Sequence, residues 1–479
     1  MKNRILSFFL LLGLIAPVWA DPMAEKMLPH QGDLDSLLEH RQLRVLVVYD
    51  NSYFYLNQGR QDGLTVSLMR EFERWLDRRY FHNNSLNMHV VFLPVRHDQL
   101  LPMLNEGKGD LALASLTPTE NRLKLADFSN PDNSGLQEWL VSRRLPQPLT
   151  RLDELAGKQV WVRRSSSYYE SLLTLNDALA GLQLAPIKIE LVDENLQDSD
   201  LLAMVSRGEI AMTLVDSHKA KLWGQAFPGL HFHRAVPLRS HSSTAWAFRK
   251  NSPQLAREVN AFLAEYGAQG AKGRALYSRH LQQGTQVARR YQLSTRNQMG
   301  WSKPAYPQYA SLFQRYGDRY DLDWLMLLAQ AYQESTLDQG ARSSKGALGV
   351  MQVLPSTASE PYINVGNIRS LENNVHAGTK YMRYIMDTYF ADANMDEQNR
   401  ALFALAAYNA GPNRIAAYRK EAMRRGLNGN VWFGHVERVA ASRVGAETVN
   451  YVKNVTSRYV AYRRSYDLLA QKTKLYRPG

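Results

Sequence analysis

The sequence contains no cysteine among its 479 residues. That absence excludes disulfide bonds, a thiol nucleophile, zinc sites built from cysteine and a lipid-modified N-terminal cysteine. A secreted chain without disulfides needs hydrophobic cores of its own, and this length is enough for two or three domains. No metal-ligand spacing is found either, so the sequence predicts no metal and no cofactor.

Long hydrophobic runs are also missing, with one exception at the N-terminus. Basic residues at positions 2 and 4 precede an apolar run over residues 5–15, and small residues lie at the −3 and −1 positions up to Ala20. This pattern predicts a secretory signal peptide over residues 1–20 that is cleaved after Ala20. The alternative is an uncleaved anchor, for which the run is short.

Acidic residues are scarce in the C-terminal half alone. Residues 271–479 hold 29 Lys and Arg against 15 Asp and Glu, a balance of +14, whereas residues 21–270 hold 27 against 30, a balance of −3. A basic half predicts a polyanionic partner or an anionic surface, with a face that serves only solubility as the alternative. Outside the cytoplasm we expect carboxylate-rich cell wall or anionic lipid, and no nucleic acid.

In the N-terminal half, β-rich runs alternate with helical segments in two successive sets. The first set is expected to contain strands at 43–49, 88–93 and 110–114 and helices at 64–76 and 98–105. The second set is expected to contain strands at 158–162, 187–192 and 210–215 and helices at 168–179 and 200–207, and a strand returns at 245–248. This alternation predicts parallel α/β sheets in two lobes with a cleft between them.

One stretch of this half carries a family signature. Residues 110–131 read Asp-Leu-Ala-Leu-Ala-Ser-Leu-Thr-Pro-Thr-Glu-Asn-Arg-Leu-Lys-Leu-Ala-Asp-Phe-Ser-Asn-Pro. The stretch resembles the signature of bacterial extracellular solute-binding proteins, in their amino-acid-binding branch, and the resemblance extends over about 43–250. It implies a two-lobed, periplasmic-binding-protein-like α/β domain, which we expect over residues 21–269, with lobes that close around a ligand.

The resemblance also implies the residues of a ligand site. Arg122 would grip a ligand carboxylate, helped by Ser115 and Thr117, and Asp216 would meet the ligand's amino group. A guanidinium suits a carboxylate, and an aspartate suits an ammonium. Ser115 stands where the family often has glycine. The alternative is a surface Arg122 and an Asp216 that only caps a helix.

Small residues at 267–273 mark a boundary, and the chain beyond it reads as almost wholly helical. We therefore expect a second, mainly α domain over residues 270–479. Its expected helices are at 308–318, 321–335, 355–360, 371–390, 398–410, 412–425 and 446–464.

Glu334 stands near the end of the second of these helices. Trp324, Leu327, Leu328 and Ala331 recur at helical spacing, so the carboxylate of Glu334 leaves the helix on its apolar side. A carboxyl that is desolvated by such neighbours keeps its proton toward neutral pH, which a general acid requires. The alternative from spacing alone is a helix-terminal glutamate in solvent.

Four short motifs occur in the order found in one enzyme family. They are Glu334-Ser335, Gly349-Val350-Met351-Gln352, Ala407-Tyr408-Asn409 and Glu447-Thr448-Val449-Asn450-Tyr451-Val452. Together they resemble the catalytic domain of soluble lytic transglycosylases, related in fold to goose-type lysozyme, with Val350 for the usual leucine. Taken singly, Tyr408 reads as a core aromatic residue and Glu447 as a favourable helix start.

The resemblance implies cleavage of the β-1,4 bond between N-acetylmuramic acid and N-acetylglucosamine, with formation of a 1,6-anhydro ring. Glu334 would be the catalytic acid and then the base. The residues that would hold sugar and acetamido groups are Ser343, Met351, Gln352, Tyr408, Asn409 and Tyr451. Asp338, the nearest carboxylate in the chain, is expected to be a solvated turn residue.

The expected partners are peptidoglycan glycan strands and, in the N-terminal cleft, a muropeptide stem or an amino acid that regulates the enzyme. The expected location is the periplasm, peripheral on the inner face of the outer membrane. Two alternatives stay open. One is a solute or muropeptide receptor that a C-terminal domain anchors to peptidoglycan, and the other is a hydrolytic muramidase, which would leave reducing ends.

Overall fold

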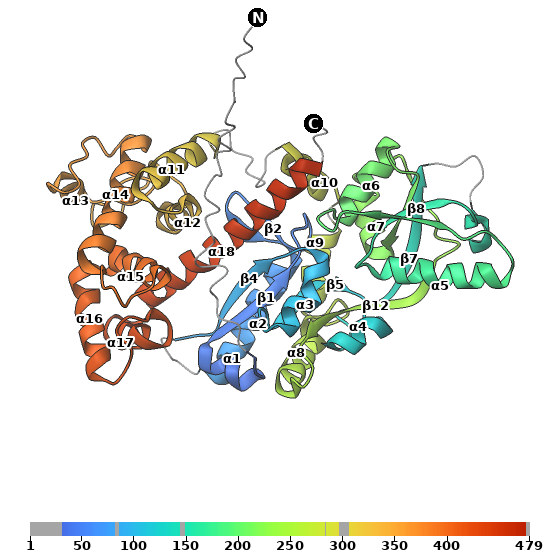
Figure 1. The fold of residues 1–479 in the computed structure, drawn as a ribbon, viewed down its shortest axis with the longest axis horizontal. Coiled ribbons are helices and arrows are strands. Elements are labelled where there is room, and N and C mark those ends of the chain that lie inside the picture. The colour runs from blue at the N-terminus through green and yellow to red at the C-terminus, as the bar shows by residue number, and fades with distance from the viewer. Residues whose placement is uncertain (1–30, 82–85, 144–148, 283, 297–305, 476–479) are drawn as a thin grey trace, which may run out of the picture.

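The computed structural model describes residues 31–81, 86–143, 149–282, 284–296 and 306–475. The predicted signal peptide at 1–20 lies outside the described residues. An α/β part comes first in the chain and a helical part follows it (Figure 1). No helix in these ranges combines the length and the apolar character needed to cross a membrane.

One mixed sheet runs through both lobes of the α/β part. Its strands are, in sheet order, β4 (His89–Pro94), β1 (Gln42–Val47), β5 (Leu111–Leu116), β12 (Arg239–Phe248), β7 (Asn133–Arg143), β10 (Met212–Asp216), β8 (Gln159–Arg163) and β9 (Lys188–Val192). Short strands β6 (Asp127–Phe128) and β11 (Leu230–Phe232) pair with β12 and β7, and β2 (Tyr55–Asn57) forms a hairpin with β3 (Arg60–Asp62). The predicted strands of both sets are present.

The expectation of purely parallel sheets is wrong at the junction between the lobes. β12 is antiparallel to β5 and to β7, and β7 is antiparallel to β10, whereas the outer pairs of each lobe are parallel. The first half of β7 pairs with β12 and its second half with β10. Both strands therefore pass directly from one lobe to the other, a course that needs no helical crossover.

Helices cover the sheet in each lobe. Those of the first lobe are α1 (Leu34–His40), α2 (Leu64–Tyr80), α3 (Leu100–Asn105), α4 (Glu120–Leu125) and α8 (Pro253–Tyr266), and those of the second are α5 (Ser167–Gly181), α6 (Asp198–Arg207) and α7 (Ser217–Trp223). α2 shows why the pattern folds this way, because its residues Leu68, Met69, Phe72 and Leu76 are buried at helical spacing. Each lobe thus has its own apolar core.

Two helices without a predicted counterpart follow the small residues at 267–273. They are α9 (Gly273–Leu281) and α10 (Gly284–Arg296), and both pack on the α/β part. Tyr277 of α9 donates a hydrogen bond to Asp132 at 2.9 Å. The boundary predicted at residue 269 stays a prediction, and these contacts favour a later one.

The helical part follows its predicted pattern closely. Its helices are α11 (Tyr306–Tyr320), α12 (Trp324–Ser335), α13 (Pro355–Ser359), α14 (Leu371–Tyr389), α15 (Glu397–Ala410), α16 (Pro412–Arg424), α17 (Glu437–Val444) and α18 (Ala446–Leu475). α17 was not expected, and α18 continues to Leu475 rather than ending at 464.

α18 lies across both parts of the molecule, as the red diagonal helix of Figure 1 shows. Ser457 donates to the carbonyl oxygen of Val90 in β4 at 3.3 Å, and Lys472 donates to Asp200 of the second lobe at 2.6 Å. A continuous apolar core extends from the first lobe into the helical part. The helical part is therefore packed against the α/β part along α18.

Candidate active site

Glu334 occupies the last turn of α12. Asp323 caps the start of this helix, because its Oδ1 accepts a hydrogen bond from the backbone of Leu325 at 2.8 Å. Leu327, Leu328 and Ala331 of this helix are completely buried. Glu334, which the helical spacing puts on the same side as these residues, is half-buried. The solvent-exposed alternative does not describe this carboxyl group.

The environment of Glu334 combines burial with one strong hydrogen bond. The hydroxyl of Tyr451, in the first turns of α18, donates to Oε1 of Glu334 at 2.5 Å. Burial raises the pKa of Glu334 to about 7, and the hydrogen bond from Tyr451 opposes that rise. Glu334 is thus poised to hold a proton and to lose it near neutral pH, which suits an acid that later acts as a base.

Tyr408 reaches the same place from α15. Its hydroxyl donates to the carbonyl oxygen of Met351 at 2.7 Å, and the nearby Glu334 adds to the burial that raises the pKa of this tyrosine. Asn409, the next residue, accepts a hydrogen bond from the hydroxyl of Thr448 at 2.8 Å. The structure therefore brings Glu334, Tyr408 and Tyr451 together, with Asn409 beside them at the end of α15.

The loop between α12 and α13 supplies the remaining predicted residues, and their positions differ. Gln352 has a left-handed backbone, and its amide nitrogen donates to Gly349 O at 2.9 Å and to Ala341 O at 3.3 Å. Ser343 is exposed, and its hydroxyl accepts from the backbone of Ala347 at 3.0 Å. The side chain of Gln352 therefore stabilises its own loop, whereas the side chain of Ser343 is accessible to a ligand.

Met351 does not fit direct contact with a sugar. Its side chain is fully buried, and its backbone carbonyl oxygen is the atom that Tyr408 contacts. The side chain instead packs on Gly378 of α14, where an added Cβ would come 2.7 Å from it. We expect Met351 to shape the site without touching the substrate.

Two buried polar residues of this site were not singled out in the sequence. Asn374 of α14 is fully buried, accepts a hydrogen bond from Met351 N at 2.8 Å, and donates to Leu348 O and Ile368 O at 2.8 and 3.0 Å. Gln330, one turn before Glu334, is fully buried with its amide facing Tyr451. The available signal was a polar residue on an otherwise apolar helix face.

The N-terminal cleft departs from the predicted ligand site at its aspartate. Asp216, at the end of β10, is almost fully buried, and its Oδ2 lies 3.4 Å from Nζ of Lys219 in the same chain. Lys219 also donates to Asp198 at 2.8 Å, and Asp198 pairs with Arg163 at 2.6 Å. Asp216 was expected to bind the positively charged amino group of a ligand. Lys219 thus already provides a positive charge at this carboxylate.

The other predicted residues of the cleft are also engaged within the chain. Arg122 donates to Thr117 O at 2.9 Å and to Ser165 O at 2.7 Å, so its guanidinium joins the first lobe to the second. Ser115 has a left-handed backbone, and its hydroxyl lies 3.4 Å from His218 Nε2. These two bonds use two of the five N–H groups of the guanidinium, so a ligand carboxylate would have to bind the remaining ones or replace a carbonyl.

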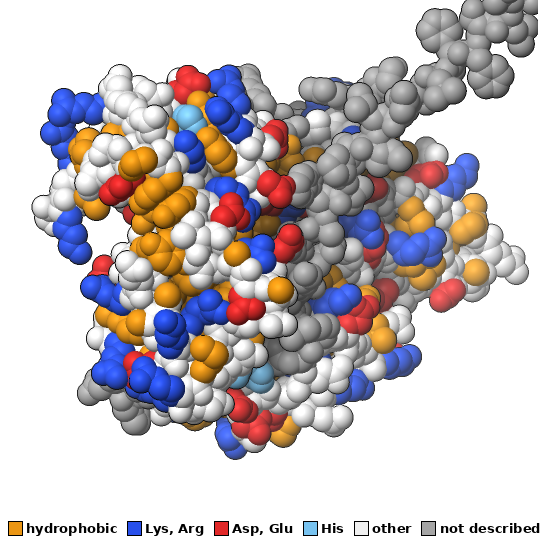
Figure 2. Space-filling model, turned by 60° about the vertical axis from the view of Figure 1, so that its left-hand side comes forward, with side chains coloured by type: hydrophobic (Ala, Val, Ile, Leu, Met, Phe, Trp, Pro, Cys, Tyr) orange, Lys and Arg blue, Asp and Glu red, His pale blue; other side chains and the backbone are white. Residues whose placement is uncertain are grey.

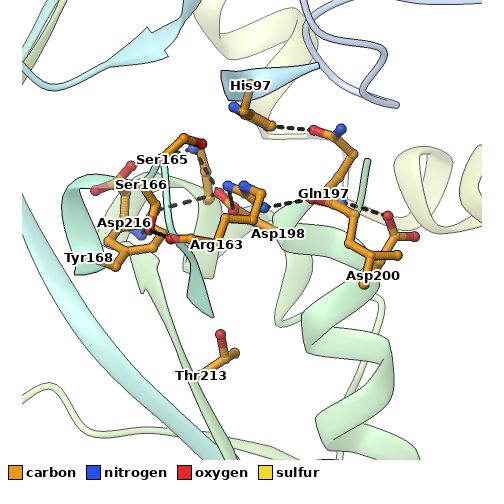
Figure 3. A network of polar contacts seen from close by, with 12 residues as sticks. His97, Arg163, Ser165, Ser166, Tyr168, Gln197, Asp198, Asp200, Thr213 and Asp216 are labelled. Atoms are coloured by element: carbon orange, nitrogen blue, oxygen red, sulfur yellow. Dashed lines mark hydrogen bonds and ion pairs between the residues drawn. The ribbon is translucent and has the colours of Figure 1, made fainter. Parts of the chain in front are cut away.

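Figure 3 shows a network of polar contacts around Arg163 and Asp198 of the second lobe, with His97 of the first lobe beside it. His97, from the first lobe, hydrogen-bonds to Gln197 of the second at 2.9 Å. Although burial opposes it, Lys219 and Arg163 hold the pKa of Asp198 below its usual range. Oδ1 of Asp216 remains buried without a hydrogen-bond partner among the described residues, so a ligand donor has one place to bind there.

The hydroxyl of Tyr451 gives a testable expectation for Glu334. We expect Tyr451→Phe to lower kcat by roughly ten- to a hundredfold, because a hydrogen bond to a charged group is lost. The hydroxyl stabilises the carboxylate form, so its loss raises the pKa of Glu334 above about 7. The acid form then persists to higher pH, and the alkaline limb of kcat/KM, measured between pH 5 and 9, moves upward.

A matched control exists on the same helix. Tyr459 donates to Asp323 at 2.8 Å, at the opposite end of α12 from Glu334. Tyr459→Phe removes the same kind of hydrogen bond without touching the carboxyl group of Glu334, so the alkaline limb should not move. An unshifted limb in Tyr451→Phe would show that the two side chains are apart in the working enzyme.

Similarity to known proteins covers both parts of the chain. Residues 43–283 match the model for bacterial extracellular solute-binding proteins, family 3, and residues 311–429 match the model for the transglycosylase SLT domain. Proteins named membrane-bound lytic murein transglycosylase F are similar over nearly the whole length. The one from Desulfosudis oleivorans is 29% identical over 91% of both chains, and the one from Shewanella woodyi is 28% identical over 98% of this chain and 92% of its own.

A third relative of the same name, from Pseudomonas fluorescens, is 27% identical over 92% of this chain and 87% of its own. The order of the two matched regions agrees with the order of the α/β and helical parts. Because the first model spans half of the residues, the assignment does not depend on a short motif. The chain belongs to family 3 of the bacterial extracellular solute-binding proteins, and it joins that module to a transglycosylase SLT domain.

Proposed function

We propose that this chain is a lytic murein transglycosylase that cleaves the β-1,4 bond between N-acetylmuramic acid and N-acetylglucosamine in peptidoglycan. The observation that carries the proposal is the position of Glu334, a half-buried carboxyl that accepts a hydrogen bond from Tyr451. Burial alone raises its pKa to about 7, with no neighbouring carboxylate contributing. Hydrolytic glycosidases ordinarily use two flanking carboxylates, so a solitary carboxyl favours a reaction in which no water is activated.

The chemistry divides into two proton transfers through one side chain. Glu334 as the acid donates its proton to the glycosidic oxygen while the bond from that oxygen to C1 of the muramyl sugar breaks. The resulting carboxylate then takes the proton of the 6-hydroxyl while O6 forms a bond to C1, which closes the 1,6-anhydro ring. Tyr451, at 2.5 Å, stabilises the carboxylate between the two steps, and the substrate's acetamido oxygen steadies the oxocarbenium-like centre.

We assign the holding of sugar and acetamido groups to Ser343, Gln352, Tyr408 and Asn409. Ser343 and Asn409 are placed to contact a ligand directly, since the first is exposed and the second stands at the end of α15. Tyr408 and Gln352 would hold the ligand as well as the loop, since they also donate hydrogen bonds to Met351 O and Gly349 O. Asp338 is exposed and accepts from Gly340 N at 2.8 Å, as a turn residue does.

Product analysis tests this assignment. The full-length protein is incubated with isolated sacculi, and the soluble products are identified by mass spectrometry. We expect muropeptides with 1,6-anhydro ends. Reducing ends would instead indicate a hydrolytic muramidase, and an absence of soluble products together with binding to sacculi would favour a receptor anchored to peptidoglycan.

For the N-terminal cleft we propose a small ligand, a muropeptide stem or an amino acid, that regulates the enzyme.

The variant Arg122→Ala tests this proposal, because Arg122 is the residue proposed to bind the ligand's carboxylate and it also joins the lobes through Thr117 and Ser165. We expect the affinity for a muropeptide stem peptide, measured by calorimetry, to fall at least about tenfold, and any stimulation of turnover by that peptide to disappear. Arg164→Ala is the control, since Arg164 is exposed and adjacent. Unchanged affinity and stimulation in Arg122→Ala would contradict the proposal.

We propose a periplasmic location, peripheral on the inner face of the outer membrane. The predicted signal peptide and the membrane-bound relatives support this location. Figure 2 gives a physical reason for surface attachment, because Lys and Arg side chains are spread over the face of the helical part that this view brings forward. Such a face attracts anionic cell wall or lipid.

A further inference from the structure

A group of tyrosines extends outward from the proposed catalytic centre. Tyr381 of α14 packs against Tyr408, with ring centroids 5.3 Å apart. One turn along the helix, Tyr384 stacks on Tyr362 with a centroid distance of 3.7 Å and an interplanar angle of 8°, and Tyr389 meets Tyr384 edge-on at 6.2 Å. Tyr381 and Tyr384 lie three residues apart on α14, so the two groups of rings follow one another along this helix from the neighbourhood of Glu334 to the surface.

The outer end of this path is exposed. Tyr362 has 39% of its surface accessible, and among the described residues of the helical part it is the only aromatic side chain exposed to that degree. Figure 2 shows hydrophobic side chains, coloured orange, gathered on the face of the helical part that this view brings forward. An exposed aromatic group that continues from a buried site is a common feature of binding surfaces.

The backbone that carries Tyr362 is held in place. Ile363, the next residue, is fully buried, and its carbonyl oxygen accepts a hydrogen bond from Lys380 of α14 at 2.8 Å. Two residues further on, Val365 N donates to Ala358 O at 3.0 Å. The exposed ring is therefore preorganised, and a ligand that binds on it does not have to order a mobile loop.

The chemistry of this surface fits a carbohydrate. A tyrosine ring offers a flat apolar face with a hydroxyl at its edge, and a pyranose offers an apolar face of C–H groups with hydroxyls around its rim. Stacking the two removes apolar area from water while the polar rims stay solvated or hydrogen-bonded. A glycan strand cleaved at Glu334 extends beyond the site on both sides, so its sugars need such surfaces nearby.

We propose that Tyr362 and Tyr384 form an aromatic platform that binds a sugar of the peptidoglycan strand at a distance from the bond that is cleaved. The proposal rests on the function proposed above and names a residue pair that sets strand-length preference. The occupant is the glycan itself, because Tyr381, three residues before Tyr384 on α14, packs on Tyr408 beside Glu334. Substrates too short to reach Tyr362 lose the contribution of the platform.

Binding to glycan tests the platform independently of catalysis. The full-length chain with Glu334→Gln is titrated with glycan strands from which the stem peptides have been removed. Adding Tyr362→Ala should weaken binding about five- to tenfold, and adding Tyr362→Phe should change it less than twofold, because the ring remains. Tyr80→Ala is the control, since Tyr80 has the same 39% exposure but lies on α2.

Three outcomes would overturn the proposal. Wild-type affinity in Tyr362→Ala would remove any role for the ring. Equal losses in Tyr362→Phe and Tyr362→Ala would assign the effect to the hydroxyl instead of stacking. Weaker binding to intact sacculi but not to peptide-free strands would place a stem peptide, and not a sugar, on these rings.

Turnover measurements separate this proposal from the proposed function. With Glu334 intact, Tyr362→Ala should reduce the preference in kcat/KM for long strands over tetrasaccharide-length fragments by about five- to tenfold, with the change in KM rather than kcat. If the reaction is misassigned, anhydro products are absent in every variant. The binding result with peptide-free strands still decides whether the platform exists.

Discussion

Glu334→Gln is expected to reduce turnover of sacculi by about 10³-fold or more while peptidoglycan binding persists. An amide of the same size has no proton to give to the glycosidic oxygen and cannot take one from the 6-hydroxyl, so both proposed steps fail together. The anhydro products are quantified by mass spectrometry, and binding is measured by sedimentation with sacculi. Turnover within tenfold of the wild type would refute the assignment of Glu334.

The same variant has an expected effect on stability that separates loss of chemistry from loss of structure. The pKa of Glu334 is raised to about 7 in the folded protein from an ordinary value of 4.5. The folded state therefore holds more protons than the unfolded state between these values, and this carboxyl makes folding less favourable as pH rises toward and past 7. A neutral glutamine avoids that loss.

We therefore expect Glu334→Gln to match the wild type in thermal stability near pH 5 and to exceed it near pH 8. Differential scanning calorimetry at the two pH values makes the comparison. A variant that is inactive but less stable at both would owe its inactivity to misfolding. The pH dependence also checks burial, because a carboxyl in free solvent would produce no such difference.

Asn374→Ala is expected to destabilise the protein by about 3 to 5 kcal/mol. The side chain of Asn374 is fully buried and satisfies the backbone of Met351, Leu348 and Ile368 at 2.8 to 3.0 Å. Each buried backbone group left without a partner costs about 1 to 3 kcal/mol. Denaturant unfolding followed by circular dichroism measures the change.

The effect should extend to activity, because Asn374 positions Met351 and the carbonyl oxygen of Met351 holds Tyr408 beside Glu334. The loop also approaches α14 too closely for any residue but glycine at Gly349, whose φ is +76° and where a Cβ would lie 2.5 Å from Asn374 Nδ2. We expect kcat to fall at temperatures where Asn374→Ala is still folded.

The neighbouring residue provides the control for this prediction. Asn373 is only half-buried, and its amide nitrogen donates to Gly366 O at 2.8 Å near the surface. Water can replace that partner, so Asn373→Ala should cost less than about 1 kcal/mol. Equal losses in the two variants would mean that the buried hydrogen bonds of Asn374 do not hold the loop.

The local sequence pattern was sufficient to predict most of the helices and strands. The helix that carries Glu334 was expected from 321 and begins at Trp324, because Asp323 serves as its cap and an N-cap residue lies outside the helix. Sheet direction was not predictable in the same way. β7 was not predicted at all, and β12 was predicted only as an ordinary strand at 245–248. Only their pairing shows that both strands pass between the lobes and run antiparallel to their neighbours.

The same distinction between local pattern and long-range contact applies to the candidate sites. The position of Glu334 on the apolar side of its helix follows from helical spacing, and the resemblance to solute-binding proteins predicted the roles of Arg122 and Asp216. The spacing of Asp216 and Lys219 says nothing of a salt bridge, and the contact of Arg122 with Ser165 joins residues 43 positions apart. Both contacts depend on how the lobes close, so the predicted ligand grip could not include them.

The sequence by itself determined the two-part organisation, the helix with its acid and the order of the four motifs, because periodicity and spacing act over a few turns of chain. Tertiary structure decided what surrounds that acid. Tyr451 approaches Glu334 from 117 residues away, and α18 continues from there to Asp200 of the second lobe. Contacts over such separations arise from packing of whole helices and strands, and packing is not encoded in any one segment.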